Sequence, residues 1–321
     1  MMRQVTLGRT KVPVSAVSLG TWAFGGANMS GKIPVGWSGQ KDADSKNALI
    51  HAWELNINHW DTADVYGEGK SEKLIGELWN TIPRQDIFLA TKVGWDMGPY
   101  SHWYNPEHMK HKMERSLKNL KTDYVDVMYL HHCNFGNNDE YFDKALETIQ
   151  QFQKDGKTRF IGLSDWSAKK IVRYINKCNP DIVQTYRNIM DDNYKSSGLK
   201  NYIDKNNIGV CFFSPIKHGL LTGKYKSPTT FEIGDHRSKV KQFIDKSIIS
   251  KMEQNKNILE KKYSNEKNAV MYGIVNSLFY DSPTGCVILG QRNTEQVEIA
   301  SSLGEIIPKK ESEWIKSLYS L

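Results

Sequence analysis

The sequence has few cysteines and no long apolar run. Its four cysteines, Cys133, Cys178, Cys211 and Cys286, are widely spaced and form no C-x-x-C pair. This spacing excludes a dense disulfide framework, and we expect reduced thiols in the core. No stretch approaches the roughly 18 apolar residues of a membrane helix, and the opening MMRQVTLGRT lacks the apolar segment of a signal peptide. We therefore expect a cytoplasmic protein without membrane contact.

The chain also lacks a concentrated charge of one sign. Its 43 basic and 36 acidic residues give a net charge of +7, but the lysines are spread along helix-like stretches such as SKVKQFIDKSIISKMEQNKNILEKK. Such runs are typical of solvated helix faces, so we expect no nucleic-acid partner. A phosphate-bearing small molecule suits the same charge balance.

No group of residues has the spacing of a metal site. His131, His132 and Cys133 are neighbours on a strand-like run, where successive side chains point to opposite faces. His108 and His111 share a predicted helix but lack a third ligand. We expect no metal.

What the chain does have is a regular alternation of strand-like and helix-like segments. The alternation predicts βα units and a parallel sheet, and eight such strands without a low-complexity linker favour a closed TIM (β/α)8 barrel over an open doubly wound sheet. We expect one domain over residues 1–321. The strand-like runs are VSAVSLG, NINHWDTA, DIFLATKVG, YVDVMYLHH, TRFIGLSDW, DIVQTYRN, IGVCFFSPI and GCVILGQ.

Two features lie outside this alternation. The opening RQVTLGRTKVPVS predicts a hairpin that plugs one end of the barrel, and residues 216–241 form a polar segment long enough for a lid or a cofactor-holding loop. Helix starts are predicted after Asn105, which is followed by Pro106, and after Ser167.

Four polar residues stand at or just after consecutive predicted strands. Asp61 and Tyr66 follow the second strand, Lys92 ends the third and His131 ends the fourth. The carboxyl ends of barrel strands converge on one mouth, so these side chains can meet. A lysine beside a phenol lowers its pKa and prepares it to donate a proton, and Asp61 would keep Lys92 charged. The set suits carbonyl reduction, but a cofactor must supply the hydride.

These motifs resemble the aldo-keto reductase family over essentially the whole chain. The matching stretches are LGRTKVPVSAVSLGTWAFGG, DTADVYGEGKSEKLIG, ATKVG, YVDVMYLHH, IGLSDWS, VQTYRN, FFSPIKHGLLTGKY and VILGQRNTEQ. The resemblance implies an NADPH-dependent reductase in which Asp61, Tyr66, Lys92 and His131 form the catalytic tetrad.

The resemblance also implies cofactor contacts at the strand ends and in the loops that follow them. Arg292 would meet the ribose 2'-phosphate, which favours NADPH over NADH. Carried over position by position, the contacts are Gly20, Thr21, Trp22 and Asp61 near the nicotinamide and first phosphates, Ser164, Asp165 and Gln184 at the carboxamide, Phe213 on the nicotinamide ring, Ser214, Ile216, Gly219, Leu220 and Lys224 along the pyrophosphate, and Gly290, Arg292 and Gln296 at the adenosine.

Three departures from the family pattern concern the cofactor and the mouth. Asp165 replaces the usual Asn, and Ile299 and Ala300 stand where relatives have Glu and Asn to read the adenine. Residues 23–40 form an additional loop after Trp22, which would cover the mouth.

Aromatic residues are the main clue to the substrate. We expect Trp22, Tyr66, Trp95 and His131 to contact it, and the aromatic-rich loop GWDMGPYSHWYNPEHM suits a sugar or keto-sugar, unless these rings pack the loop or a subunit contact. The predicted function is NADPH-dependent reduction of an aldehyde or ketone to an alcohol. The alternative is a cofactor-binding sensor, because the family includes channel-associated subunits, and a homo-oligomer is left open.

Overall fold

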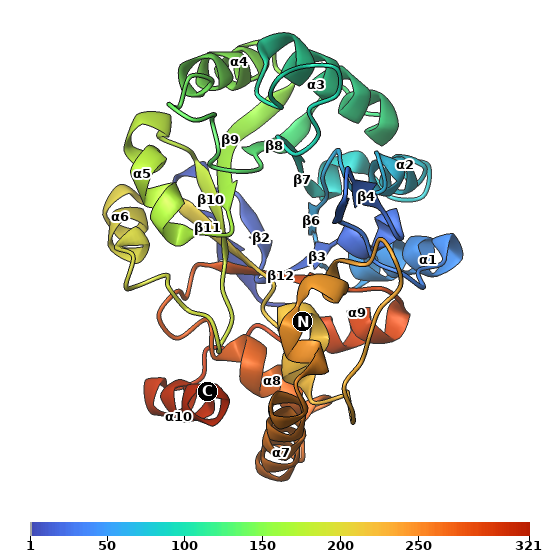
Figure 1. The fold of residues 1–321 in the computed structure, drawn as a ribbon, viewed down its shortest axis with the longest axis vertical. Helices are drawn as coiled ribbons and strands as arrows, with labels where there is room; N and C mark the ends of the chain where they lie inside the picture. The colour runs from blue at the N-terminus through green and yellow to red at the C-terminus, as the bar shows by residue number, and fades with distance from the viewer. Residues whose placement is uncertain (1) are drawn as a thin grey trace.

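Eight parallel strands close into a barrel in the computed structural model, which describes residues 2–321 (Figure 1). Each strand pairs with the next along the chain, and β12 pairs with β3 to complete the ring. The eight runs expected as strands are confirmed, and so is the closed barrel. The strands are β3 (Val17–Gly20), β6 (His59–Asp61), β7 (Phe88–Val93), β8 (Val125–Leu130), β9 (Thr158–Asp165), β10 (Ile182–Tyr186), β11 (Gly209–Phe213) and β12 (Cys286–Gly290).

Helices surround the barrel (Figure 1). As predicted, the Asn105 side chain accepts from the first backbone N–H groups of α3, and the Ser167 side chain accepts from the Lys170 N–H in α5. Among residues 2–321, every helix falls short of the length and apolar character that crossing a bilayer requires. The helices are α1 (Asp42–Glu54), α2 (Lys70–Gly76), α3 (Pro106–Leu120), α4 (Phe142–Lys154), α5 (Ala168–Cys178), α6 (Leu199–Asn206), α7 (Lys246–Lys262), α8 (Ala269–Asn276), α9 (Thr294–Ser301) and α10 (Lys309–Tyr319).

The barrel strands are buried on both faces. Every residue of β7 and β8 is buried, as expected for parallel strands with side chains filling the barrel inside and helices packed outside. Most of these residues are apolar, and Lys92, near the carboxyl end of β7, is an exception. A buried cation needs a charged or polar partner, which directs attention to that end of the barrel.

The predicted N-terminal hairpin is present. β1 (Gln4–Thr6) pairs antiparallel with β2 (Pro13–Ser15). The turn between them packs under the start of β11: Gly8 has φ +47°, and a Cβ there would lie 2.4 Å from the Gly209 nitrogen. A side chain at residue 8 would therefore be both strained and in collision. The hairpin lies at the amino ends of the strands, opposite the mouth.

The additional loop of residues 23–40 lies at the carboxyl ends of the strands. It contains a small hairpin made of β4 (Met29–Ser30) and β5 (Ile33–Pro34). The predicted lid segment, 216–241, follows β11 and contains short 3-10 turns at Lys217–Thr222 and His236–Lys239 with irregular chain between them.

These two loops join directly. The Gly36 N–H donates to the Gly234 carbonyl at 3.0 Å, and the His236 N–H donates to the Gly36 carbonyl at 2.9 Å. We call this junction of residues 36–38 with residues 234–237 the clasp. It converts two separate loops into one continuous wall over the mouth.

A polar group inside the barrel was not expected. Ser18 Oγ lies 2.7 Å from His59 Nδ1 and 2.5 Å from Cys286 Sγ. The ligand-type atoms of His59, Cys211 and Cys286 lie within 4.8 Å of one another. Hydrogen bonds to Ser18 and to the Ser15 carbonyl pair His59 Nδ1 and Cys286 Sγ, whereas His59 Nε2 has no partner within residues 2–321. The expectation of no metal stays a prediction. All four cysteines are buried and free, as expected.

Candidate active site

Three of the four predicted catalytic side chains meet at the barrel mouth. Lys92 Nζ donates to Asp61 Oδ1 at 2.7 Å and lies 3.3 Å from the Tyr66 hydroxyl. A third contact, to the Thr62 carbonyl at 2.6 Å, completes the surroundings of the ammonium. Asp61 Oδ2 accepts from Gln184 Nε2 at 2.7 Å. The buried cation is therefore paired and also touches a phenol.

The protonation states follow from burial and from this pairing. Burial alone would lower the pKa of Lys92, but Asp61 and Tyr66 outweigh burial and raise it. Burial raises the pKa of Tyr66, with Lys92 opposing. The expectation that Lys92 brings this pKa below its usual value is therefore wrong for the structure, because desolvation of the phenolate is the larger effect. Tyr66 is held as a protonated phenol next to a cation.

His131 is the fourth member and follows the last residue of β8. Its ring lies edge-on to Tyr66, with centroids 6.2 Å apart, and stacks on His132 at 4.8 Å. Burial lowers the pKa of His131 well below 6.5, and the neighbouring His132 and Lys92 add to this effect. Its Nδ1 is buried and has no hydrogen-bond partner within residues 2–321. A neutral imidazole therefore lines the cavity beside Tyr66.

A cavity of about 440 Å³ opens over this group. Most residues predicted for the cofactor and the substrate line it, and Ile299 lines it as well, whereas Ala300 is buried. The predicted residues in the wall are Gly20, Trp22, Asp61, Tyr66, Trp95, His131, Ser164, Gln184, Phe213, Ser214, Ile216, Gly219, Lys224, Gly290, Arg292 and Gln296.

Four predicted residues lie behind the wall. Lys92 is covered by Asp61 and Tyr66, Leu220 is fully buried, and Thr21 Oγ1 donates to the Asp61 carbonyl at 2.9 Å. Asp165 accepts from the backbone N–H groups of Cys133 and Ser167, at 2.8 and 2.7 Å. Its carboxylate fastens two loops and does not line the cavity. Its expected contact with a carboxamide stays a prediction.

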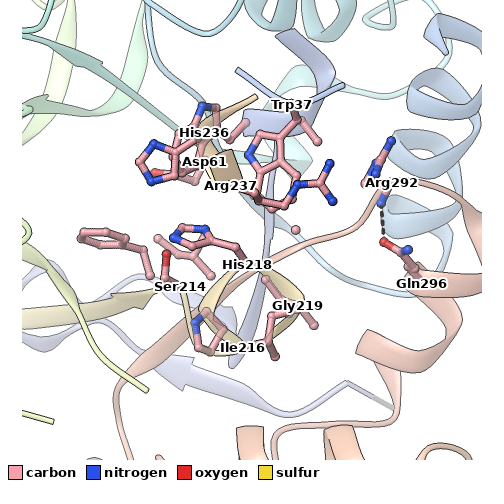
Figure 2. A pocket seen from close by; sticks show the side chains of 18 of the residues that line it. Trp37, Asp61, Ser214, Ile216, His218, Gly219, His236, Arg237, Arg292 and Gln296 are labelled. Carbon is pink, nitrogen blue, oxygen red and sulfur yellow. Dashed lines mark hydrogen bonds between the residues drawn. The ribbon is translucent and has the colours of Figure 1, made fainter. Parts of the chain in front are cut away.

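The cavity residues missed from the sequence include Trp166, His218, His236 and Arg237. The last three lie in the 216–241 segment, where no periodicity indicates which side chains point inward. Figure 2 shows Arg237 close to Trp37, with Arg292 and Gln296 on the far side of Arg237. The Arg237 guanidinium lies 4.6 Å from the centroid of the Trp37 ring.

Asp235 holds the clasp together. Its carboxylate accepts from the Ser38 N–H at 2.9 Å, from Ser38 Oγ at 2.8 Å and from Arg237 Nη2 at 2.6 Å. Burial alone would raise the pKa of Asp235, but these donors outweigh burial and lower it to about 2. One buried carboxylate thus neutralises Arg237 and fixes the additional loop.

Arg292 is engaged by the same additional loop. Its Nη2 donates to the carbonyls of Ser38 and Gly39, at 3.1 and 2.6 Å, and its Nε donates to Gln40 Oε1 at 2.8 Å. The Arg292 N–H donates to Gln296 Oε1 at 3.0 Å (Figure 2). Within residues 2–321 only Nη1 of its guanidinium has no hydrogen-bond partner.

Comparison with known proteins agrees with this geometry. A sequence model described as Aldo/keto reductase family matches residues 16–318. The chain is 31% identical over 212 residues to the aldo-keto reductase yakc [NADP(+)] of Schizosaccharomyces pombe, covering 64% of this chain and 62% of that protein. It is 30% identical over 238 residues to the NADH-specific methylglyoxal reductase of Escherichia coli, covering 69% and 70%.

A solved structure supports the fold. The glycerol dehydrogenase of Gluconobacter oxydans superposes with a TM-score of 0.79 at 25% identity, over 98% of this chain and 94% of that one. The chain spans under two thirds of the length of the yakc protein. The names of the two sequence relatives specify different nicotinamide cofactors, NADP(+) and NADH.

Proposed function

The chain belongs to the aldo/keto reductase family, and from this membership we propose that it reduces an aldehyde or ketone to an alcohol with NADPH. The observation that carries the proposal is the buried Lys92 shared between Asp61 and the Tyr66 hydroxyl. A screen of NADPH oxidation across aldehydes, ketones and keto-sugars tests it. A protein that only senses the cofactor would leave NADPH reduced in single-turnover mixing with every carbonyl.

Each member of the tetrad has a distinct role in this proposal. Tyr66 donates its proton to the substrate oxygen, and the adjacent Lys92 ammonium stabilises the phenolate that remains. Asp61 keeps Lys92 charged and oriented. The neutral His131 gives the substrate oxygen a second hydrogen bond as negative charge develops there.

The cavity wall fits a phosphorylated dinucleotide. Ser164 and Gln184 would hold a carboxamide, and Phe213 would stack on the nicotinamide ring. When bound, NADPH would supply the hydride that no side chain here can supply. The wall has four cations against the two carboxylates of Asp61 and Glu260, an excess that suits phosphate groups. These cations are Lys224, Arg237, Lys256 and Arg292.

Arg292→Ala tests the cofactor choice. We expect NADPH affinity to fall by about 10- to 100-fold and NADH affinity to fall much less, because only NADPH has a 2'-phosphate for the guanidinium. Fluorescence titration with both cofactors measures this difference. Gln40→Ala is the matched control, because it removes one contact between Arg292 and the additional loop and keeps the guanidinium. Equal weakening of both cofactors by Arg292→Ala would show that Arg292 only anchors the loop.

The pH dependence of reduction follows from the two buried groups. Tyr66 must be protonated to act as an acid, and its raised pKa keeps it so into the alkaline range. His131, with a lowered pKa, is already neutral. We expect kcat to stay level from about pH 6 to about pH 9 and to fall only above that, as Tyr66 loses its proton. A limb near pH 6.5 that His131→Asn abolishes would contradict the neutral role of His131.

A further inference from the structure

Four neighbouring strands of the barrel each place a polar side chain in its interior. The strands β11, β12, β3 and β6 follow one another around the ring, and in the same order they carry Cys211, Cys286, Ser18 and His59. All four residues are fully buried. We call them the interior group. The inside of such a barrel is normally filled by branched apolar side chains, so packing alone does not explain this group.

The polar atoms of the interior group lie close together. Cys211 and Cys286 are direct partners in the register of β11 and β12. Cys286 Sγ lies 3.5 Å from His59 Nδ1, and Ser18 Oγ lies 2.7 Å from that nitrogen and 2.5 Å from Cys286 Sγ. The ligand-type atoms of His59 and the two cysteines all lie within 4.8 Å of one another. Tetrahedral zinc holds sulfur and nitrogen ligands about 3.5 to 4 Å apart, so these side chains need only small rotations to bind it.

The charge state of the two thiols suits a cation. Burial alone would raise the pKa of Cys286, but its contacts with Cys211, His59 and Ser18 outweigh burial and lower it to about 5. Cys286 is therefore a thiolate near pH 7. Burial, together with the neighbouring Cys286, holds the pKa of Cys211 well above its usual value of 9.0. A buried thiolate costs free energy unless it is compensated, and a bound metal ion would compensate it and release the Cys211 proton.

We propose that the interior group is a structural zinc site, with Cys211, Cys286 and His59 as ligands and the Ser18 hydroxyl in the fourth position. Thiolate and imidazole ligands select zinc or copper over magnesium or calcium. Two thiolates cancel the charge of a zinc ion, whereas monovalent copper would leave a net negative charge in the dry interior. Four protein ligands without an open position are typical of a structural zinc site, not of a catalytic one.

The interior group is separate from the proposed active site. None of its four members is among the described residues that line the cavity over Tyr66. His59 begins β6 and Asp61 ends it, so the group lies deeper in the barrel than the tetrad. The proposal replaces the sequence-based expectation of no metal, which considered only groups close together in the chain. A bound zinc would tie β12 to β3, where the last and first barrel strands close the ring.

Metal analysis of the wild-type chain tests the proposal. The full chain is produced without a histidine tag in zinc-supplemented medium and is then dialysed against EDTA, which removes zinc from exposed histidines. We expect about one zinc per chain to remain, because an enclosed site fills as the barrel folds and exchanges slowly afterwards. Protein produced with Co2+ in place of zinc should show the strong visible absorption and sulfur-to-cobalt charge-transfer band of tetrahedral, thiolate-bound cobalt. Folded protein that retains neither metal would overturn the proposal.

Cys211→Ala and Cys286→Ala then locate the metal. Each removes one thiolate, so the zinc content after EDTA should fall at least about 10-fold. Cys178→Ala is the matched control, because Cys178 is a buried thiol of α5 outside the interior group, and its zinc content should equal that of the wild type. Circular dichroism verifies that each variant is folded. Zinc retained by either folded variant would overturn the proposal. If neither variant folds, the cobalt spectrum of the wild type decides, because cobalt bound without sulfur lacks the charge-transfer band.

Discussion

Tyr66→Phe should abolish most turnover while leaving cofactor affinity unchanged. The substitution removes one oxygen, which lies 3.3 Å from Lys92 Nζ at the base of the cavity. General acid catalysis is typically worth about 100- to 10,000-fold, so we expect kcat to fall within that range. Steady-state NADPH oxidation measures kcat, and fluorescence titration measures binding.

A second buried tyrosine gives the control for this experiment. Tyr129 is fully buried on β8, and its hydroxyl has one long contact, 4.0 Å to Cys211 Sγ. Tyr129→Phe removes the same atom from the barrel interior and should change kcat little. Turnover near the wild-type value in Tyr66→Phe would contradict the role of Tyr66 as the acid.

Lys92→Met should lower both turnover and stability. Lys92 is 1% exposed and pairs with Asp61, which is 3% exposed. Removing one partner of a buried ion pair costs about 3 to 5 kcal/mol, because the other charge is left uncompensated. We therefore expect the free energy of unfolding to fall by about this amount at neutral pH, and kcat to fall at least as far as in Tyr66→Phe. Urea denaturation measures the first effect.

The double variant Lys92→Met/Asp61→Asn separates the two effects. Replacing both charges removes the uncompensated carboxylate, so much of the lost stability should return. Turnover should stay low, because no cation remains beside Tyr66. Recovery of turnover together with stability would show that Lys92 acts only through folding.

The fold and the core of the site were accessible from the sequence because both depend on periodic features. Strand runs at regular intervals specify the barrel, and the carboxyl ends of consecutive strands must share one mouth. Asp61 and Lys92 lie on neighbouring strands, so their meeting follows from the topology. The same logic located Gln184 on β10, although its bond to Asp61 was not foreseen.

The parts that escaped prediction depend on long-range contacts between irregular loops. His218, His236 and Arg237 occupy a segment whose conformation is determined by its junction with the additional loop. Arg292 matched the family pattern, but nothing in the sequence indicates that its guanidinium donates to the carbonyls of Ser38 and Gly39. The pKa of Tyr66 was misjudged because burial, which outweighs Lys92 here, is a property of the assembled mouth.

The clasp also determines when the cavity can exist. Ser38 and Asp235 are 197 positions apart in the chain, and seven of the eight barrel strands lie before Asp235. During synthesis, Trp22 and Trp37 emerge early, yet the wall they belong to cannot close until residues 234–237 have left the ribosome. Contacts of such long sequence separation form late, because closing the intervening chain into a loop costs entropy before the contacts stabilise the structure. A nascent or truncated chain that stops short of this point has the tetrad residues but no finished cavity.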